Sequence, residues 1–226
     1  MNHQLGASET GSVLEKPGVS DSSRVLKNTY MLLAATLLFS AVTALISMSY
    51  RLPLPHGLLM LVVFYALLFL IHKTQNSSWG IIFTFALTGL LGASLGPILN
   101  QVLHMSNGTA IIAQSLIMTG VTFVGLSLWV AKTRKDMDFL QGFLLVGFFV
   151  LLTGVLVSFF IQATFLSLAI SAGFVLFASA SILFQTSQIV RGGETNYVMA
   201  TISLYVSIYN LFVSILSLTG YFSRDD

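Results

Sequence analysis

The chain has 226 residues, of which 55% are hydrophobic and 8% are charged, and its mean hydropathy is +0.88. Apolar residues in this proportion outnumber what one water-soluble core of this length can bury, so the composition excludes a soluble globular protein and indicates an integral membrane protein. The net charge of +2 is the difference between ten basic and eight acidic residues, and the basic residues are scattered along the chain, which excludes a nucleic-acid partner. The lack of cysteine excludes disulfides, thiol catalysis and thiolate metal sites.

The N-terminal segment, residues 1–28, is predicted to be a flexible cytoplasmic tail. It is polar, rich in Ser, Gly and Glu, and it has no apolar core of the kind that a cleaved signal peptide requires. The first membrane span is expected from Thr29 to Tyr50, as an uncleaved signal anchor. The turn that follows, "RLPLPH", holds two prolines, which cannot continue the helix.

Seven apolar runs along the chain are candidate membrane spans, of which the second is short and the third is interrupted by Gly96 and Pro97. They are expected at 29–50, 57–71, 79–103, 109–131, 139–161, 165–190 and 198–221. The bilayer requires about 20 apolar residues for each helical crossing. The prediction is therefore an all-α integral membrane protein with seven transmembrane helices, a membrane domain over 29–222 and a short C-terminal end over 223–226.

The positive charges predict the orientation of these spans, because loops that stay in the cytoplasm carry an excess of Lys and Arg. Eight of the ten basic residues fall on the side of the N-terminus: Lys16, Arg24, Lys27, Lys73, Lys132, Arg134, Lys135 and Arg191. The other side receives Arg51 and Arg224. The N-terminus is thus expected in the cytoplasm and the C-terminus in the periplasm. An even number of spans, with one of them re-entrant, would return the C-terminus to the cytoplasm.

The stretch "GLLGASLGPILN" in the third run has two interpretations. Gly92, Ser94 and Gly96 form the G-x-S-x-G elbow of many hydrolases, whereas Gly92 and Gly96 alone form a G-x-x-x-G helix-packing motif. A catalytic serine needs a base at the same depth. Every histidine and lysine lies in the tail, in a loop or at a span end. The residues therefore favour Gly92 and Gly96 as helix-packing glycines, and no enzyme activity is expected.

The carboxylates also lie outside the spans. They are Glu9, Glu15, Asp21, Asp136, Asp138, Glu194, Asp225 and Asp226. Charged groups buried in the bilayer are the usual mark of proton relays and cation sites. A carboxylate cation site or a proton relay inside the membrane is therefore not expected.

The last two spans instead carry stripes of neutral polar residues. On the last span these are Ser203, Ser207, Asn210, Ser214 and Ser217, and on the sixth span Ser171, Ala178, Ser181, Gln185 and Gln188. Spacings of three and four place each set on one helix face. Two interpretations stay open: hydrogen-bonded helix packing, or a polar cavity that opens toward Arg191 and Glu194.

The connection between these spans, "VRGGETNY", is predicted to be a tight cytoplasmic turn formed by Arg191, Gly192, Gly193 and Glu194. The two glycines can end the sixth span in a left-handed conformation, and Thr195 or Asn196 can cap the last one. The loop "KTRKDMDF" at 132–139 has charges of both signs and is expected to be a solvated anchor rather than a ligand site.

Several of these segments resemble the transmembrane Bax inhibitor motif family. The resemblance rests on "GLLGASLGPIL" at 89–99, "TGVTF" at 119–123 and "ILFQTSQIVRGGETNYVMATISLYVSIYNLFVSIL" at 182–216. The segments "RVLKNTYMLLAATLLFSAVTA" at 24–44, "TRKDMDFL" and "GGETNYVMATISLYVSIYNLF" are similar to the bacterial branch of the family, whose typical member modulates the FtsH protease. The likeness covers residues 24–224.

The resemblance implies a bundle of six helices around a central last span. It also implies a bacterial inner-membrane regulator that binds FtsH, with its companions HflK and HflC, and restrains the degradation of membrane proteins such as SecY. No cofactor is implied. Other family members are calcium leak channels gated by an aspartate pair, which gives the alternative function, a cation leak. The matching positions here are Gln185 and Ser207, neither of which can ionise, and this weakens the alternative.

Overall fold

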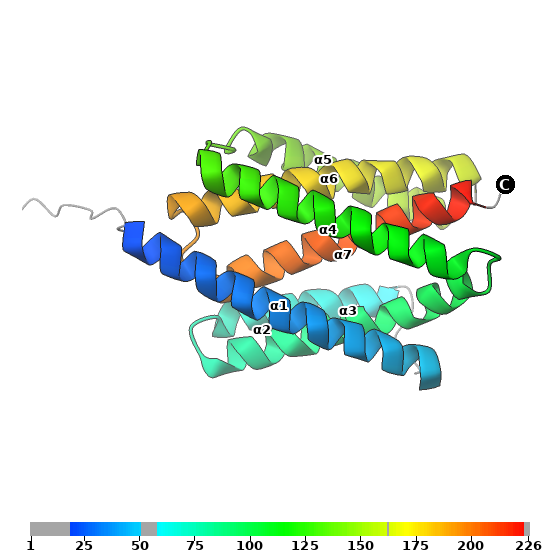
Figure 1. Ribbon diagram of the computed structural model, residues 1–226, viewed down its shortest axis with the longest axis horizontal. Helices are drawn as coiled ribbons and strands as arrows, with labels where there is room; N and C mark the ends of the chain where they lie inside the picture. The colour runs from blue at the N-terminus through cyan, green and yellow to red at the C-terminus, as the bar shows by residue number, and fades with distance from the viewer. Residues whose placement is uncertain (1–18, 51–57, 162, 224–226) are drawn as a thin grey trace, which may run out of the picture.

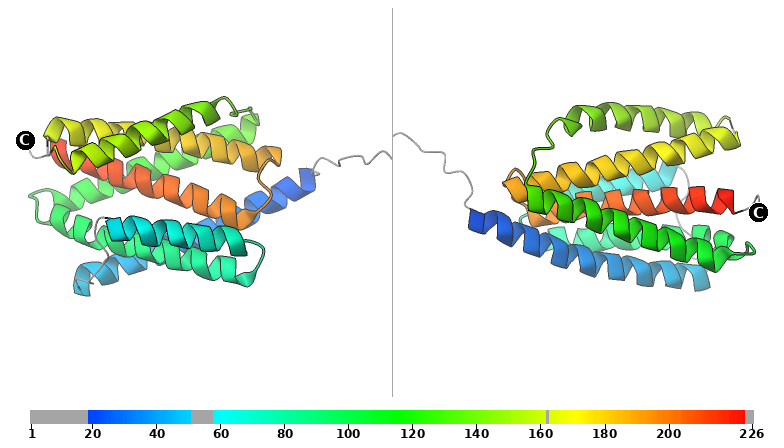
Figure 2. Two further views of the ribbon diagram at one scale, coloured as in Figure 1. Left: turned by 180° about the vertical axis from the view of Figure 1, so that it is seen from behind. Right: turned by 45° about the horizontal axis from the view of Figure 1, so that its top comes forward.

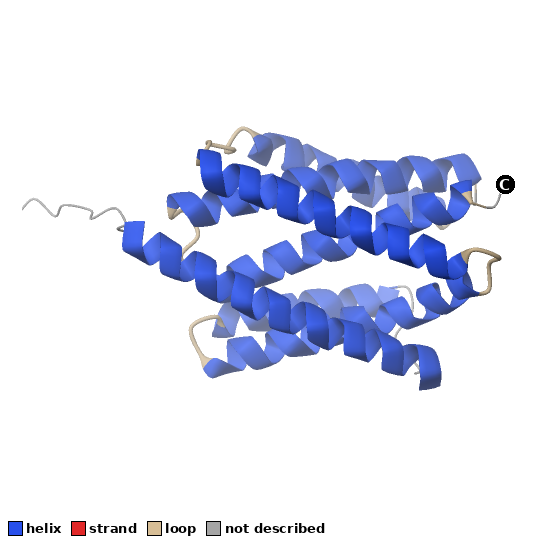
Figure 3. Ribbon diagram, viewed as in Figure 1, coloured by secondary structure: helices blue, strands red, loops and turns tan. Residues whose placement is uncertain are grey.

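The computed structural model describes residues 19–50, 58–161 and 163–223, and every regular element in them is an α-helix (Figure 3). There are seven in these ranges: α1 (Val19–Tyr50), α2 (Leu58–Thr74), α3 (Ser78–Leu103), α4 (Gly108–Thr133), α5 (Leu140–Ser158), α6 (Thr164–Arg191) and α7 (Tyr197–Phe222). Six are long and apolar enough to cross a membrane, and α2 has a shorter apolar stretch, Leu59–Thr74. The predicted all-α fold with seven helices is confirmed.

The first helix begins earlier than the sequence predicted. α1 starts at Val19, ten residues before Thr29, so residues 19–28 continue the helix and are not part of a tail. The physical reason is that this stretch contains neither Pro nor Gly, and its charged residues can lie beyond the hydrocarbon while the helix runs on. The rest of the predicted tail, residues 1–18, lies outside the described residues.

Successive helices run in opposite directions, and α7 lies between two groups of them (Figures 1 and 2). It packs against α1, α2, α3, α4 and α6, whereas α5 packs only against α6 among the described helices. In the most apolar stretch of α7, 67% of the residues are buried, compared with 6% in α5. The central last helix implied by the family resemblance is therefore confirmed.

The start of α1 and the end of α7 lie at opposite ends of the bundle (Figure 1). At the end where α1 starts, which we call the basic end, lie the α2–α3, α4–α5 and α6–α7 connections. Every lysine and arginine within the described ranges belongs to this end: Arg24, Lys27, Lys73, Lys132, Arg134, Lys135 and Arg191. The positive charges that the positive-inside rule counts are thus gathered at one end of the folded bundle.

Candidate functional site

The α6–α7 hairpin carries most of the residues that the sequence singled out, and a tight turn closes it. Gly192 adopts a left-handed backbone with φ 78°, and the N–H groups of Gly193 and Glu194 donate to the Gln188 carbonyl at 2.8 and 3.1 Å. These bonds satisfy the carbonyl that α6 leaves free at its end. Gly193 also lies against the Gln188 side chain, where a Cβ would clash. The sequence places glycine where the turn has no room for a larger residue.

Asn196 begins α7 and anchors the hairpin to a second connection. Its side-chain oxygen accepts from the N–H groups of Val198 and Met199 at 2.9 and 3.2 Å. Its amide nitrogen donates to the Gln75 carbonyl at 3.3 Å and to Asn76 Oδ1 at 2.8 Å. Of the two caps that the sequence allowed, the structure uses Asn196, and the same side chain holds the α2–α3 connection at the basic end.

The polar stripes of α6 and α7 face each other along the hairpin. The Gln185 amide nitrogen donates to Ser207 Oγ at 3.3 Å, and Ser171 Oγ donates to Ser217 Oγ at 3.2 Å nearer the far end. Ser207 also donates to the Ser203 carbonyl one turn earlier, at 2.9 Å. Small and amide side chains that bond across two helices are typical of membrane helix packing. This geometry favours the packing interpretation of the two stripes.

One polar atom in this interface has no partner. Gln185 Oε1 is buried and accepts no hydrogen bond. Asn210, one turn from Ser207, is half-buried. No Asp, Glu, His or Lys lies on α6 or α7, and the described residues contain no group of three or more His, Cys, Asp or Glu that could hold a metal ion. The centre of the hairpin is thus polar and uncharged.

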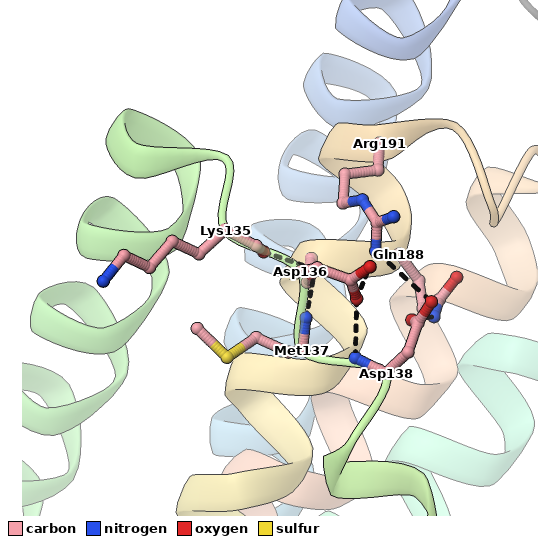
Figure 4. A network of polar contacts seen from close by, with 7 residues as sticks. Lys135, Asp136, Met137, Asp138, Gln188 and Arg191 are labelled. Atoms are coloured by element: carbon pink, nitrogen blue, oxygen red, sulfur yellow. Dashed lines mark hydrogen bonds and ion pairs between the residues drawn. The ribbon is translucent and has the colours of Figure 1, made fainter.

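Gln188 does not line the interface with Gln185. It turns to the α4–α5 loop, where its amide nitrogen donates to Asp138 Oδ1 at 2.6 Å (Figure 4). The Arg191 guanidinium pairs with Asp136 Oδ1 at 2.5 Å and with Asp138 Oδ2 at 3.4 Å. We call these four side chains the clasp, because they hold the loop against the end of α6. The loop is exposed to solvent as expected, with 55% of the Asp136 side chain and 53% of the Asp138 side chain accessible. It is also bound to the end of α6 through these contacts.

The backbone of the loop is held at the same place. Ser187 Oγ donates to the Lys135 carbonyl at 2.9 Å and accepts from the Met137 N–H at 3.3 Å, and the Met137 side chain is buried (Figure 4). The Asp138 N–H donates to Asp136 Oδ1 at 2.8 Å. This backbone bond, with the Arg191 guanidinium, lowers the pKa of Asp136 against a smaller opposing effect of desolvation.

Ser94 lies in a helix-packing contact. Its hydroxyl donates to the Leu91 carbonyl at 2.6 Å and contacts the Tyr209 hydroxyl at 2.8 Å. Its neighbours Gly92 and Gly96 lie against α1: a Cβ on Gly92 would clash with the Ser40 carbonyl, and one on Gly96 would come within 2.6 Å of Ser47 Oγ. The glycines let the backbones of α1 and α3 approach closely.

A second tyrosine on the same face of α7 extends this contact. The Tyr205 hydroxyl donates to Ser40 Oγ at 2.6 Å and lies 3.1 Å from the Thr88 carbonyl. Sequence reasoning missed both tyrosines as partners. The signal was their spacing of four residues, which places two hydroxyls on one face of the helix.

Comparisons with known proteins agree with this architecture. The family model described as inhibitor of apoptosis-promoting Bax1 matches residues 22–224. An uncharacterised Pseudomonas aeruginosa protein is 58% identical over 204 residues, covering 90% of this chain and 92% of that protein. YccA of Escherichia coli K12, named as modulator of FtsH protease, is 50% identical over 211 residues, covering 93% of this chain and 96% of its own.

Two further relatives carry names that refer to the membrane. A YccA from another Escherichia coli strain is called an inner membrane protein and shows the same 50% identity. A Vibrio cholerae protein called an uncharacterised membrane protein is 43% identical over 207 residues, covering 91% of this chain and 93% of that protein. With its apolar helices and its central α7, the chain is a multi-pass membrane protein that belongs to the Bax inhibitor family, in the branch that contains YccA.

Proposed function

We propose that this chain is an inner-membrane regulator that binds the FtsH protease and restrains its degradation of membrane proteins. The observation that supports this is the likeness to YccA, which runs over 93% of this chain and 96% of that modulator. Because the match runs over nearly the full length of both proteins, almost every part of the modulator has a counterpart in this chain.

The proposed regulator acts by binding rather than by catalysis. Ser94 has a carbonyl and a tyrosine hydroxyl as its partners, neither of which is a base of the kind that activates a serine nucleophile. Much of the bundle surface is apolar, and α5 exposes Phe143, Leu145, Val146 and Phe149. Such a surface suits contact with lipid and with the membrane helices of a partner.

In this proposal the basic end faces the cytoplasm and the C-terminus faces the periplasm, because basic loops are retained on the cytoplasmic side. The same proposal includes HflK and HflC as companions of the complex and SecY as a substrate that is protected from degradation. These finer points rest on the family resemblance.

Co-purification tests the binding step. The tagged chain is expressed in an Escherichia coli strain that lacks YccA, extracted in mild detergent, and its associated proteins are quantified by mass spectrometry. FtsH should be recovered in near-stoichiometric amounts and should be missing from a tagged multi-pass protein of similar length. Recovery of the chain without FtsH would contradict the proposal. The lifetime of SecY in cells with a jammed translocon gives a second readout, and it should lengthen when the chain is present.

A cation leak through the α6–α7 hairpin is the second candidate. The observation in its favour is the buried, unpaired Gln185 Oε1, because a buried carbonyl oxygen is costly unless something binds it. Gln185 and Ser207 are both neutral and are hydrogen-bonded to each other, which weakens this candidate. The cation leak therefore has less support than binding of the protease.

A further inference from the structure

A cleft of about 570 Å³ lies between α1 and α4, with α3 and α7 behind it. Figure 1 looks toward this side of the molecule, where α7 is seen between α4 and α1. No Cα atom of α1 lies within 8 Å of one in α4, so the two helices do not close over the space between them. The volume is within the roughly 300–1,000 Å³ that small-molecule sites occupy.

The cleft opens sideways, toward the hydrocarbon of the bilayer. Leu45 on α1 and Leu116 on α4 both line it, and they are 62% and 56% exposed. Its floor is formed by Ile208 and Phe212 of the central helix, which are only 8% and 7% exposed. The exposed side of the cleft thus lies between α1 and α4, and the central helix closes it from behind.

The walls offer almost nothing to a polar ligand. Among the described residues no charged side chain lines the cleft, and hydroxyl groups come from Ser40, Thr109, Thr119, Tyr205 and Tyr209. Four of these five are already bonded within the protein: Tyr205 to Ser40, Tyr209 to Ser94, and Thr119 to the Ser115 carbonyl at 2.7 Å. The fifth, Thr109, lies in the first turn of α4.

An apolar space of this kind does not hold water well, because a buried water needs about two to four polar partners. Left empty, its lining atoms would lose dispersion contacts on the open side. Hydrocarbon from the adjoining bilayer supplies those contacts without requiring any hydrogen bond. We propose that the α1–α4 cleft binds an acyl chain of a membrane phospholipid, held against α7 inside the bundle.

The chain offers a matched pair of variants to test this proposal. A Cβ built on Gly120 or on Gly125 meets no atom within 4 Å, and both glycines are exposed on α4. Only Gly120 lines the cleft. Gly120→Trp therefore fills the cleft with a large apolar side chain, and Gly125→Trp adds the same side chain to the same helix outside it.

The measurement is photolabelling of the full chain in liposomes of phosphatidylethanolamine and phosphatidylglycerol that contain a phospholipid with a diazirine in mid-acyl chain. Trypsin cleaves after Arg191 and Arg224, which isolates α7 in one peptide, and after Lys135 and Arg191, which isolates α5 with α6. Fragmentation of the α7 peptide then locates the label. The α5–α6 peptide reports general contact with lipid, since only 6% of the residues in the most apolar stretch of α5 are buried.

We expect label within residues 205–212 of the wild-type chain, although this segment belongs to the central helix. Gly120→Trp should lower that label about tenfold, as displacement of a ligand by ~1.4 kcal/mol would, and Gly125→Trp should leave it unchanged. Label in the α5–α6 peptide should stay the same in all three proteins. Gly120→Leu repeats the test with a smaller side chain if the tryptophan variant fails to fold.

Three results would overturn the proposal. Absence of label from residues 205–212 in the wild type, or equal label in wild type and Gly120→Trp, means that no acyl chain occupies the cleft. If Gly120→Trp instead converts a wild-type dimer into a monomer on size-exclusion chromatography, the cleft belongs to a second copy of the chain.

Discussion

The Gln185 side chain on α6 donates a hydrogen bond to the Ser207 hydroxyl on α7 across 3.3 Å. By the family resemblance these two positions correspond to the aspartate pair that gates calcium leak in other members. Two neutral groups hold the hairpin together here by a bond that no change of pH between 5 and 9 can titrate, since neither side chain ionises. The α6–α7 contact at these two positions is thus independent of pH in this range.

Replacing both residues by aspartate should turn this contact into a titratable one. Two carboxylates at this spacing repel each other when ionised and attract a divalent cation. We expect Gln185→Asp with Ser207→Asp to create or strengthen a pH-dependent calcium flux in liposomes loaded with a calcium indicator, and the wild type to show little pH response. The neutral double variant Gln185→Asn with Ser207→Asn separates charge from size. A steeply pH-dependent flux through the wild type would contradict this account.

The close approach of α1 and α3 predicts a strong effect of adding one methyl group. A Cβ on Gly92 has no room beside the Ser40 carbonyl and the Thr43 hydroxyl, so Gly92→Ala must push the two helices apart. We expect it to lower stability by about 1–3 kcal/mol, the usual cost of overpacking, measured by thermal unfolding in detergent. Gly125→Ala, which meets no neighbouring atom and lies outside the cleft, is the control and should unfold no more readily than the wild type.

Ser94→Ala distinguishes packing from catalysis. The change removes the hydroxyl that contacts Tyr209, and membrane hydrogen bonds of this kind contribute on average about 0.6 kcal/mol each. We therefore expect a small loss of thermal stability and unchanged recovery of FtsH in the co-purification. Loss of function in a variant that folds and reaches the membrane normally would revive the hydrolase interpretation.

The clasp predicts a local effect at the basic end. Arg191→Ala removes the ion pairs to Asp136 and Asp138, so hydrogen exchange at residues 136–138 should accelerate while α6 stays protected. Lys132→Ala, which removes a positive charge from the same end, should leave that exchange unchanged. Equal exchange in Arg191→Ala and wild type would show that the Ser187 backbone contacts hold the loop alone.

The ion pair between Arg191 and Asp136 should depend on pH, and the sign of this dependence follows from the lowered pKa of Asp136. A carboxyl with a lowered pKa in the folded state stabilises it above the ordinary value of about 3.9, and loses this contribution as pH falls through the folded value. The clasp should therefore stay closed from neutral pH down to about 4.

The absence of cysteine from the chain allows its orientation to be mapped with single substitutions. Ser78→Cys lies beside the α2–α3 connection at the basic end, and Ser106→Cys lies in the α3–α4 connection at the other end; both serines are exposed. An impermeant maleimide added to cells with a permeabilised outer membrane should label Ser106→Cys and should reach Ser78→Cys only after lysis. The opposite pattern would place the N-terminus in the periplasm.

Six of the seven helices could be predicted from the sequence because the bilayer requires a minimum apolar length for each crossing, and the shorter α2 could be predicted only from its hydropathy. Helical spacing also placed Ser207 and Gln185 on faces that meet. The partners of other side chains were beyond such reasoning: Gln188 has the right spacing for the stripe, yet it bonds Asp138, fifty residues away along the chain. The helical spacing of residues in the sequence shows which face of a helix a side chain lies on. The residue that it contacts there depends on how the helices pack in the bundle.

The central position of α7 has a consequence for how the protein is made. Of the seven helices it is the last to leave the ribosome, so α1, α3, α4 and α6 enter the membrane before the helix that they surround exists. Before α7 is synthesised, Gln185 lacks its acceptor, the Ser207 hydroxyl, and Ser40 lacks its donor, the Tyr205 hydroxyl. The first six helices therefore cannot reach their final packing until α7 has inserted among them.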